Sequence, residues 1–225
     1  MNKTVKISKR LSAIAEIVRF KSVCDIGCDH GILPLFLLQS GSVEKVAVCD
    51  ISEPSLNKAR EALSGYSQAL VRLSDGLAEI EPNEFETCVI AGMGGLLIKD
   101  ILSRRLNAAK AFSQIILSPH NNVFALRKFL VENSFEIAAE RIVFEDGKWY
   151  NILECRFNAE FQDIYSRAEL LFGKFRPPMF YDFIKHELER ARKIELAANG
   201  KNGDVTERIK TCEELLDKEC EGVRA

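Results

Sequence analysis

Two acidic residues each follow a short apolar run in the first quarter of the 225-residue chain, and glycines flank the turn after the first. Asp25 closes one run, and Gly27 and Gly31 enclose the turn that follows it. Glycines at a strand-to-helix turn let backbone amides approach a ligand closely. Asp50 ends the next run, nineteen residues beyond Gly31, where a carboxylate can accept the hydroxyls of an adenosine ribose. The chain is therefore expected to bind an adenosine-containing cofactor.

A parallel sheet is needed to bring these residues together, and the sequence predicts one. Short β-rich runs alternate with helix-like segments, a pattern typical of a parallel sheet covered on both faces. Strands are predicted at 23–26, 45–49, 69–73, 87–91 and 114–118. Helices are predicted from near residue 11 and at 32–39, 54–63, 95–106 and 123–133. Both acidic residues then lie at the carboxyl edge of the sheet.

The end of this domain departs from a purely parallel pattern. Two β-rich runs, 135–144 and 148–157, are joined across an Asp-Gly pair, which is a strong hairpin signal. The predicted fold class is α/β, a Rossmann-like doubly wound sheet that finishes in an antiparallel hairpin. The sequence places this domain at 1–157 and a helical tail domain at 158–225.

Composition limits the classes of function. The net charge of −2 is not that of a strongly basic protein, but the first 22 residues carry six basic residues against one acidic residue. Such a segment favours an anionic partner such as nucleic acid, or it is simply a solvated helix face. There is no apolar run long enough for a membrane span and no signal-peptide core, so a cytoplasmic protein is expected. Seven cysteines, mostly in apolar runs and not at zinc-site spacing, predict buried reduced thiols and no metal.

The spacing of the glycine loop indicates which class of adenosine-containing cofactor the chain binds. It reads Asp25-x-Gly27-x-Asp29-x-Gly31, whereas a nicotinamide-binding domain would show Gly-x-Gly-x-x-Gly. This loop resembles motif I of the class I methyltransferases that use S-adenosylmethionine, whose usual form is Asp/Glu-x-Gly-x-Gly-x-Gly. Those enzymes also carry a reversed hairpin strand at the sheet edge. The resemblance implies the same fold and cofactor here.

Four segments narrow the resemblance to one family. They are Ile-Ser-Lys-Arg-Leu at 7–11, the glycine loop at 25–31, Arg-Leu-Ser-Asp-Gly-Leu at 72–77 and Ile-Ala-Gly-Met-Gly-Gly at 90–95. In this order they resemble the bacterial tRNA adenine-N1 methyltransferases acting at position 22, the TrmK family, from about residue 7 to 157. The family commonly shows Gln-Pro-Asn after the fifth strand, where this chain has Ser-Pro-His-Asn at 118–121.

The resemblance implies two sets of binding residues. Contacts to S-adenosylmethionine are expected from Asp25, Ile26, Gly27, His30, Gly31, Asp50, Ile51, Asp75, Gly76, Leu77, Ala91, Gly92 and Met93. Contacts to the tRNA substrate are expected from Lys9, Arg10, Gly94, Gly95 and Asn121. The glycines at 92, 94 and 95 have a rival explanation, a tight packing turn between strand and helix, and His30 could merely stabilise its own turn.

Asp29 is the candidate catalytic residue. Methylation of adenine N1 yields a cation, and a nearby carboxylate could stabilise the developing charge or accept the N6 proton. Alternatively Asp29 caps the following helix or binds the amine of the cofactor. Because N1 lies on the Watson–Crick edge, the base must be extruded, and Phe124, Trp149 and Tyr150 are candidate stacking partners or core residues.

The helical tail leaves its role open. A helix is predicted at 159–172, followed by two heptad-like helices around the glycine-rich turn at 199–203, an antiparallel coiled-coil hairpin. The tail holds 12 basic and 14 acidic residues, so it could grip tRNA through a few cations or serve packing or dimerisation.

The function that these features predict is in-line methyl transfer from S-adenosylmethionine to adenine N1 in tRNA by a protein that is expected to be monomeric. The alternatives are a class I methyltransferase for another RNA, a small molecule or a protein, and a non-enzymatic RNA-binding module.

Overall fold

The computed structural model describes residues 5–197 and 203–222. The chain divides into two compact units, Met1–Ile164 and Tyr165–Ala225, whereas the sequence placed the boundary at 157/158. Within the described ranges, no helix combines the length and apolar character that a membrane crossing requires.

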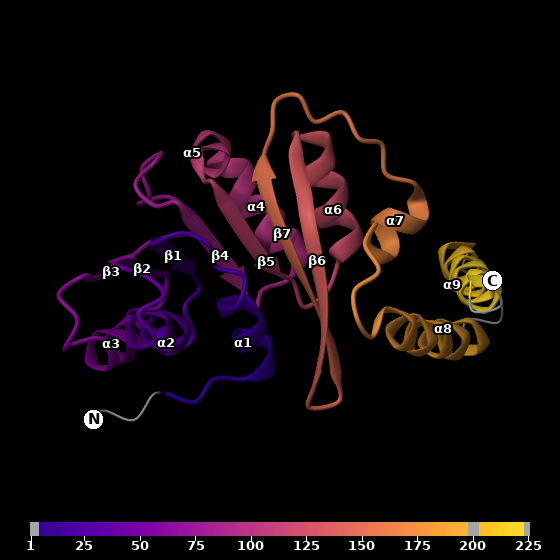
Figure 1. Ribbon diagram of the computed structural model, residues 1–225, viewed down its shortest axis with the longest axis horizontal. Coiled ribbons are helices and arrows are strands. Elements are labelled where there is room, and N and C mark those ends of the chain that lie inside the picture. The colour runs from indigo at the N-terminus through magenta and orange to yellow at the C-terminus, as the bar shows by residue number, and fades with distance from the viewer. Residues whose placement is uncertain (1–4, 198–202, 223–225) are drawn as a thin grey trace. The chain divides into compact units, whose positions relative to one another are not determined.

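The first unit is built around one seven-stranded sheet with the order β3-β2-β1-β4-β5-β7-β6 (Figure 1). Strands β1 to β5 pair in parallel, and β7 pairs antiparallel with both β5 and β6. The strands are β1 (Ser22–Ile26), β2 (Lys45–Asp50), β3 (Ala69–Leu73), β4 (Thr87–Ala91), β5 (Gln114–Ser118), β6 (Phe135–Glu145) and β7 (Lys148–Phe157). The predicted Rossmann-like fold with its terminal hairpin is confirmed.

Helices cover the sheet in two layers (Figure 1). One layer consists of α1 (Lys9–Ala15), α2 (Ile32–Gln39) and α3 (Glu53–Ala62). The other consists of α4 (Gly95–Arg104), α5 (Leu106–Ala111) and α6 (Val123–Glu132). The prediction of one helix over 95–106 was wrong at its end, because the backbone of Arg105 leaves the helical region (φ −126°, ψ 48°) and a separate α5 follows.

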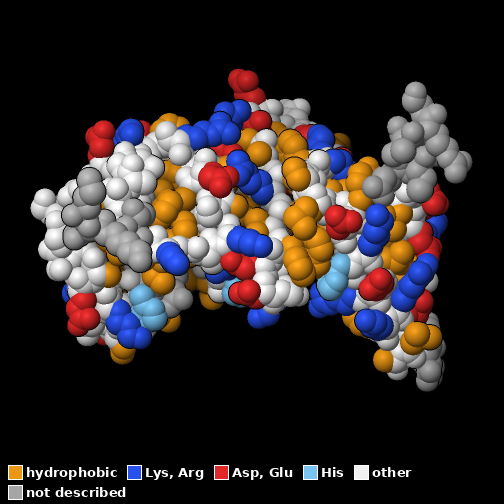
Figure 2. Space-filling model, turned by 60° about the horizontal axis from the view of Figure 1, so that its bottom comes forward, with side chains coloured by type: hydrophobic (Ala, Val, Ile, Leu, Met, Phe, Trp, Pro, Cys, Tyr) orange, Lys and Arg blue, Asp and Glu red, His pale blue; other side chains and the backbone are white. Residues whose placement is uncertain are grey.

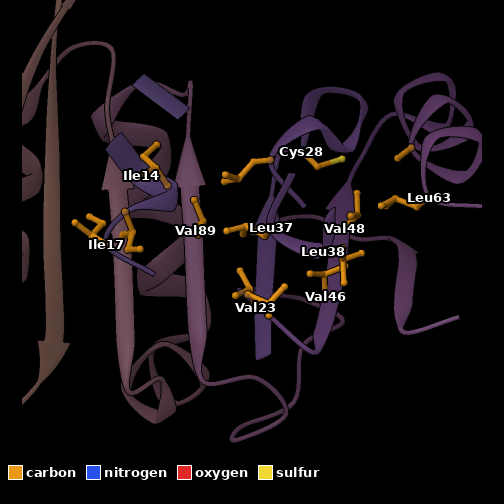
Figure 3. Packing of buried hydrophobic residues seen from close by; sticks show 14 of the residues in the cluster. Ile14, Ile17, Val23, Cys28, Leu37, Leu38, Val46, Val48, Leu63 and Val89 are labelled. Atoms are coloured by element: carbon orange, nitrogen blue, oxygen red, sulfur yellow. The ribbon is translucent and has the colours of Figure 1, made fainter. Parts of the chain in front are cut away.

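Alternate residues of the central strands form the core against α1, α2 and α3 (Figure 3). Val23, Val46, Val48 and Val89 are fully buried on this face, and the parallel register places Val23 opposite Val46. The opposite face of the same strands is equally apolar, as expected for a sheet covered on both sides. Burial of each such side chain contributes about 1.5–3 kcal/mol. This core fixes the strand ends that carry the site.

A buried polar cluster holds the N-terminal segment against the sheet. The Gln114 side-chain amide donates to the carbonyl oxygen of Ile17 (2.6 Å) and to the carboxylate of Glu154 (2.8 Å). Arg19 pairs with the same Glu154 carboxylate at 3.0 Å. One of the basic residues near the N-terminus is therefore used for structure. The cluster ties the segment that follows α1 to β5 and β7, although these strands lie far along the chain.

The second unit is helical and consists of α7 (Arg167–Phe172), α8 (Phe180–Ala197) and α9 (Gly203–Gly222). The prediction of a helix over the whole of 159–172 was wrong in its first half. Helix α7 begins only after Ser166, because Ser166 and Glu169 form a reciprocal capping box that fixes the helix start there.

Helices α8 and α9 run antiparallel to each other. Thr206 near the start of α9 donates to Glu195 near the end of α8 at 2.8 Å, and Arg208, further along α9, pairs with Glu187, which lies further back along α8. The predicted apolar positions Ile184 and Ile209 are buried. The coiled-coil geometry of the pair stays a prediction, and the turn predicted at 199–203 falls, except for Gly203, outside the described residues.

Six cysteines are free and buried, and the side chain of Cys220 lies outside the described part of the structure. Burial raises the pKa of the Cys28 and Cys49 thiols to about 12, which keeps them protonated. In the described ranges, no three His, Cys, Asp or Glu side chains come together as a metal site would require.

Candidate active site

The candidate site lies at the carboxyl ends of β1, β2 and β4. The sheet order changes direction between β1 and β4, and ligands of open α/β sheets bind at such a switch point. Because the three strands are parallel, the turns that follow them share one edge. The first turn is tied to the second strand, since the amide of Gly27 donates to the carbonyl oxygen of Cys49 at 2.8 Å.

The first glycine turn is shaped by positive backbone angles and by packing. Gly27 has φ +75°, and His30 and Gly31 follow with φ 69° and 68°. A Cβ atom on Gly31 would lie 3.2 Å from the Cβ of Ala59 in α3, so this glycine is needed for close packing. The ammonium group of Lys58 donates to Nε2 of His30 at 2.8 Å. His30 thus braces the turn against α3.

The structure describes the side chain of Asp25 but not that of Asp29. Asp25 lies within β1 and is only 5% exposed, so its carboxylate is part of the protein interior beneath the turn. The backbone of Asp29 belongs to a short 3-10 turn (Asp29–Gly31), but its side chain is outside the described part of the structure. The catalytic role of Asp29 therefore stays a prediction.

Asp50 is the last residue of β2 and presents a carboxylate at the sheet edge. Its Oδ1 atom accepts a hydrogen bond from the amide of Ser52 at 2.8 Å, which orients the group and leaves Oδ2 able to accept from a ligand. Ile51, the next residue, is 71% exposed although it is a large apolar side chain. An oriented carboxylate beside an exposed apolar surface suits the ribose and the adenine ring of a nucleoside.

The Asp75-Gly76-Leu77 segment packs against α4. Arg104 of α4 donates to both carboxylate oxygens of Asp75, at 2.6 Å and 3.1 Å, which lowers the pKa of that carboxyl. A Cβ on Gly76 would lie 2.8 Å from Ile101, so this glycine too serves packing. The Leu77 side chain is buried, which leaves its backbone as the part that could meet a ligand.

The Gly92–Gly95 turn contains two kinds of glycine. Gly92 is exposed with φ +85°, and a Cβ there would meet nothing closer than 3.7 Å. Gly95 is buried, and a Cβ there would lie 2.6 Å from the carbonyl oxygen of Asn121. The packing explanation therefore holds for Gly95, while Gly92 leaves open backbone next to Ala91. Gly94 lies between them, beside the Asn121 side chain.

Met93 connects the first turn to this one. A Cβ on Gly27 would lie 2.0 Å from the terminal methyl of Met93, so this side chain lies directly over the glycine turn after β1. The predicted cofactor residues of β1 and β4 are thus brought into contact, which suits one ligand bound across both turns.

Two of the residues predicted to contact substrate, Arg10 and Asn121, lie beside Gly92 and Gly94 respectively. Arg10 donates to Nε2 of His120 at 2.9 Å, and its guanidinium lies 4.9 Å from the ring centre of Tyr150. Oδ1 of Asn121 accepts from the side chain of Asn122 at 2.8 Å. Lys9 is exposed.

His120 is a residue of this region that the sequence analysis did not select. Its signal was the departure at 118–121, where a histidine enters a motif that commonly reads Gln-Pro-Asn. Of the three stacking candidates, Tyr150 is the one whose described contacts place it beside Arg10 and His120, whereas Trp149 packs on Phe144 with ring centres 4.7 Å apart.

The donor set fits S-adenosylmethionine. The turn after β1 offers glycine backbone at positive φ, β2 ends in an oriented carboxylate with an apolar neighbour, and the turn after β4 leaves Gly92 open. These groups suit an amino-acid moiety, a ribose, an adenine and a reacting methyl group respectively.

Comparison with known proteins agrees with this geometry. Residues 7–153 match a family model described as a methyltransferase domain. The tRNA (adenine(22)-N(1))-methyltransferase of Bacillus subtilis strain 168 is 32% identical over 178 residues, which span 76% of this chain and 75% of that protein.

Solved structures match the chain over nearly its full length. Streptococcus pneumoniae Sp1610 in complex with S-adenosyl-L-methionine has 30% identity and a TM-score of 0.85, with 94% of this chain and 100% of that chain covered. M. capricolum TrmK in complex with S-adenosyl-homocysteine has 25% identity and a TM-score of 0.82, with 94% and 98% covered. The chain belongs to the methyltransferase domain family and, within it, to the family of the tRNA (adenine(22)-N(1))-methyltransferases.

Proposed function

We propose that this protein methylates N1 of adenine 22 in tRNA and uses S-adenosylmethionine as the methyl donor. The observation that carries the proposal is the extent of the similarity. The B. subtilis enzyme matches over 178 residues, and the S-adenosyl-L-methionine complex of Sp1610 matches over 94% of this chain. The match therefore includes the helical unit as well as the sheet that forms the cofactor site.

The cofactor would supply a methyl group bound to a positively charged sulfur, which makes that carbon an electrophile. In our proposal the Gly27–Gly31 turn receives the amino-acid moiety, Asp50 accepts the ribose hydroxyls, and Ile51 lies against the adenine ring. In-line transfer depends on orientation, which can contribute about 7–11 kcal/mol in favourable systems. The chain's main task is thus to hold two reactants in line.

Adenine N1 carries a lone pair at neutral pH, so the protein needs no strong base to expose its nucleophile. The transferred methyl leaves a positive charge on the base, and a carboxylate close to it would stabilise that charge. Asp29 is our candidate for this role because it stands in the turn after β1. Replacement by asparagine and by alanine would separate charge from hydrogen bonding.

The base must leave its stem before N1 is accessible, at a cost of a few kcal/mol. We propose that it enters beside Gly92, where the backbone is open, and that the neighbouring Arg10 and Tyr150 contact the extruded nucleotide. A tRNA substrate and the buried free thiols also favour the cytoplasm as the place of the reaction.

The test is a methylation assay on unmodified tRNA transcripts. Purified protein is incubated with S-adenosylmethionine and transcript, and the digested nucleosides are analysed by mass spectrometry. We expect 1-methyladenosine, and we expect it to disappear with a transcript that carries guanosine at position 22. With the Asp50→Ala variant its yield should fall when S-adenosylmethionine is limiting. Cofactor binding without any methylated nucleoside would contradict the tRNA substrate and direct the search to other acceptors.

A further inference from the structure

Arg10 differs from most arginines of the first unit in its electrostatic surroundings. Salt bridges to carboxylates are made by Arg19, Arg60, Arg72, Arg104, Arg127, Arg141 and Arg156. Within the described ranges Arg10 has no such salt bridge. The Glu145 carboxylate accepts from the backbone amide of Arg10 at 3.3 Å and exerts a Coulombic attraction, without pairing with the guanidinium. Among the described residues, therefore, no carboxylate forms an ion pair with the Arg10 guanidinium.

Two neutral groups hold this guanidinium in place. Nε2 of His120 accepts a hydrogen bond from Nη1 of Arg10 at 2.9 Å, and the Tyr150 ring lies under the guanidinium with 4.9 Å to its centre. The His120 and Tyr150 rings meet edge to face at 5.9 Å. Partial desolvation of the ring, and then the positive charges of Arg10 and Lys148, lower the pKa of His120. The imidazole thus stays neutral and orients Arg10 without neutralising it.

This cluster faces the open glycine of the site. A Cβ on Gly92 would lie 3.7 Å from each Nη atom of Arg10 and 3.9 Å from Nε2 of His120. The backbone of His120 is fixed to the same turn, because its amide donates to the carbonyl oxygen of Met93 at 2.8 Å. Gly92 and His120 are both exposed, so a ligand can reach the cluster from solvent. An oriented cation therefore stands at the edge of the transfer site.

We propose that Arg10 binds a phosphate of the tRNA backbone next to the methylated nucleotide and that His120 is the positioning residue which holds Arg10 for that contact. The inference rests on the proposed function. A guanidinium offers paired donors to phosphate oxygens, and a phosphate contact fixes the register of a nucleic acid without reading its bases. Basic side chains on the face shown in Figure 2 lie in small groups among acidic and apolar ones.

The experiment measures steady-state kinetics and tRNA binding of four variants. Arg10→Gln removes the cation. His120→Ala removes the acceptor of the Arg10 hydrogen bond, and His120→Gln supplies an acceptor oxygen in its place. Arg156→Gln is the matched control, since Arg156 is an exposed arginine of β7 paired with Glu136. Thermal melting checks that each variant is folded.

We expect Arg10→Gln and His120→Ala to raise the KM for tRNA roughly ten- to hundredfold, as for the loss of a charged hydrogen bond. The KM for S-adenosylmethionine should stay unchanged. The slope of log Kd for tRNA against log salt should fall by about one in Arg10→Gln. His120→Gln should recover most of the affinity, and Arg156→Gln should resemble the wild type.

Unchanged KM and salt slope in Arg10→Gln would overturn the phosphate contact. A lower kcat in His120→Ala with an unchanged KM for tRNA would overturn the positioning role, because the imidazole would then act on the chemistry. Failure of the proposed function looks different, since the wild type itself would then give no 1-methyladenosine; tRNA binding and its salt slope would still decide the role of Arg10.

Discussion

Replacement of Gly95 by alanine tests whether the turn after β4 is held by packing. A Cβ at this position would lie 2.6 Å from the carbonyl oxygen of Asn121 and 2.7 Å from that of Asn122, and real Cβ atoms essentially never come within 3.0 Å. Both atoms belong to the backbone and cannot rotate away. Gly95 is also the first residue of α4, and its amide donates to the Asn121 carbonyl oxygen at 3.0 Å.

The cost can be estimated from these contacts. Overpacking at a tight site costs about 1–3 kcal/mol, and weakening of the amide hydrogen bond adds about 0.5–1.5 kcal/mol. Alanine regains about 0.5–1 kcal/mol through the lower conformational entropy of its unfolded chain. We expect a net loss of about 2 kcal/mol in the free energy of unfolding. For a chain of this size that corresponds to a Tm lower by about 4–8 °C.

Thermal and urea unfolding of Gly95→Ala measure this loss, and Gly94→Ala is the matched control. At Gly94, which has φ −68°, a Cβ would lie 3.1 Å from Oδ1 of Asn121, the end of an exposed side chain that can rotate. The control should therefore melt within about 2 °C of the wild type, since surface changes are usually worth less than about 0.5 kcal/mol. Equal melting temperatures for the two variants would refute the packing explanation of Gly95.

Three further predictions concern the site and its support. Asp50→Ala should weaken S-adenosylmethionine binding roughly tenfold or more by calorimetry, because hydrogen bonding of the ribose to a charged group is lost, and an unchanged Kd would contradict the ribose contact. Arg127→Met should lower the free energy of unfolding, measured in urea, by about 3–5 kcal/mol, because it leaves the buried carboxylate of Glu140, 2.7 Å from Arg127, without its ion-pair partner. Adding Glu140→Leu should restore much of this loss. Arg104 lowers the pKa of Asp75. The pair therefore stabilises the fold at pH values above the ordinary carboxyl pKa, and this stabilisation is lost as the pH falls through the lowered pKa. Arg104→Ala should return the Asp75 pKa to its usual range in a carboxyl NMR titration, and an unmoved pKa would show that Arg104 is not the cause.

The sequence alone determined the elements of the first unit and the edge at which the site lies. Helix and strand periods depend on local residues, so β3, β4, β5, β7 and α2 have the bounds that the sequence predicted. The strand–helix alternation then determined that the turn after Asp25 and the end of β2 at Asp50 share one edge, because parallel strands end together. The bounds were wrong at two places: the break at Arg105, which depends on backbone geometry, and the start of α7 after Ser166, where the Ser166–Glu169 capping box was a local signal that the prediction missed.

Only the tertiary structure decided what the individual side chains do. Gly92 and Gly95 are alike in sequence, yet one faces open space and the other the backbone of the loop after β5. The site cluster joins distant parts of the chain: Arg10 lies 110 residues before His120, which lies 30 residues before Tyr150. The three side chains meet because α1 packs against the sheet edge. Periodicity encodes which face a residue takes, but not which distant side chain it will touch. That choice depends on how whole elements pack, and for this reason the site's electrostatics emerged only from the fold.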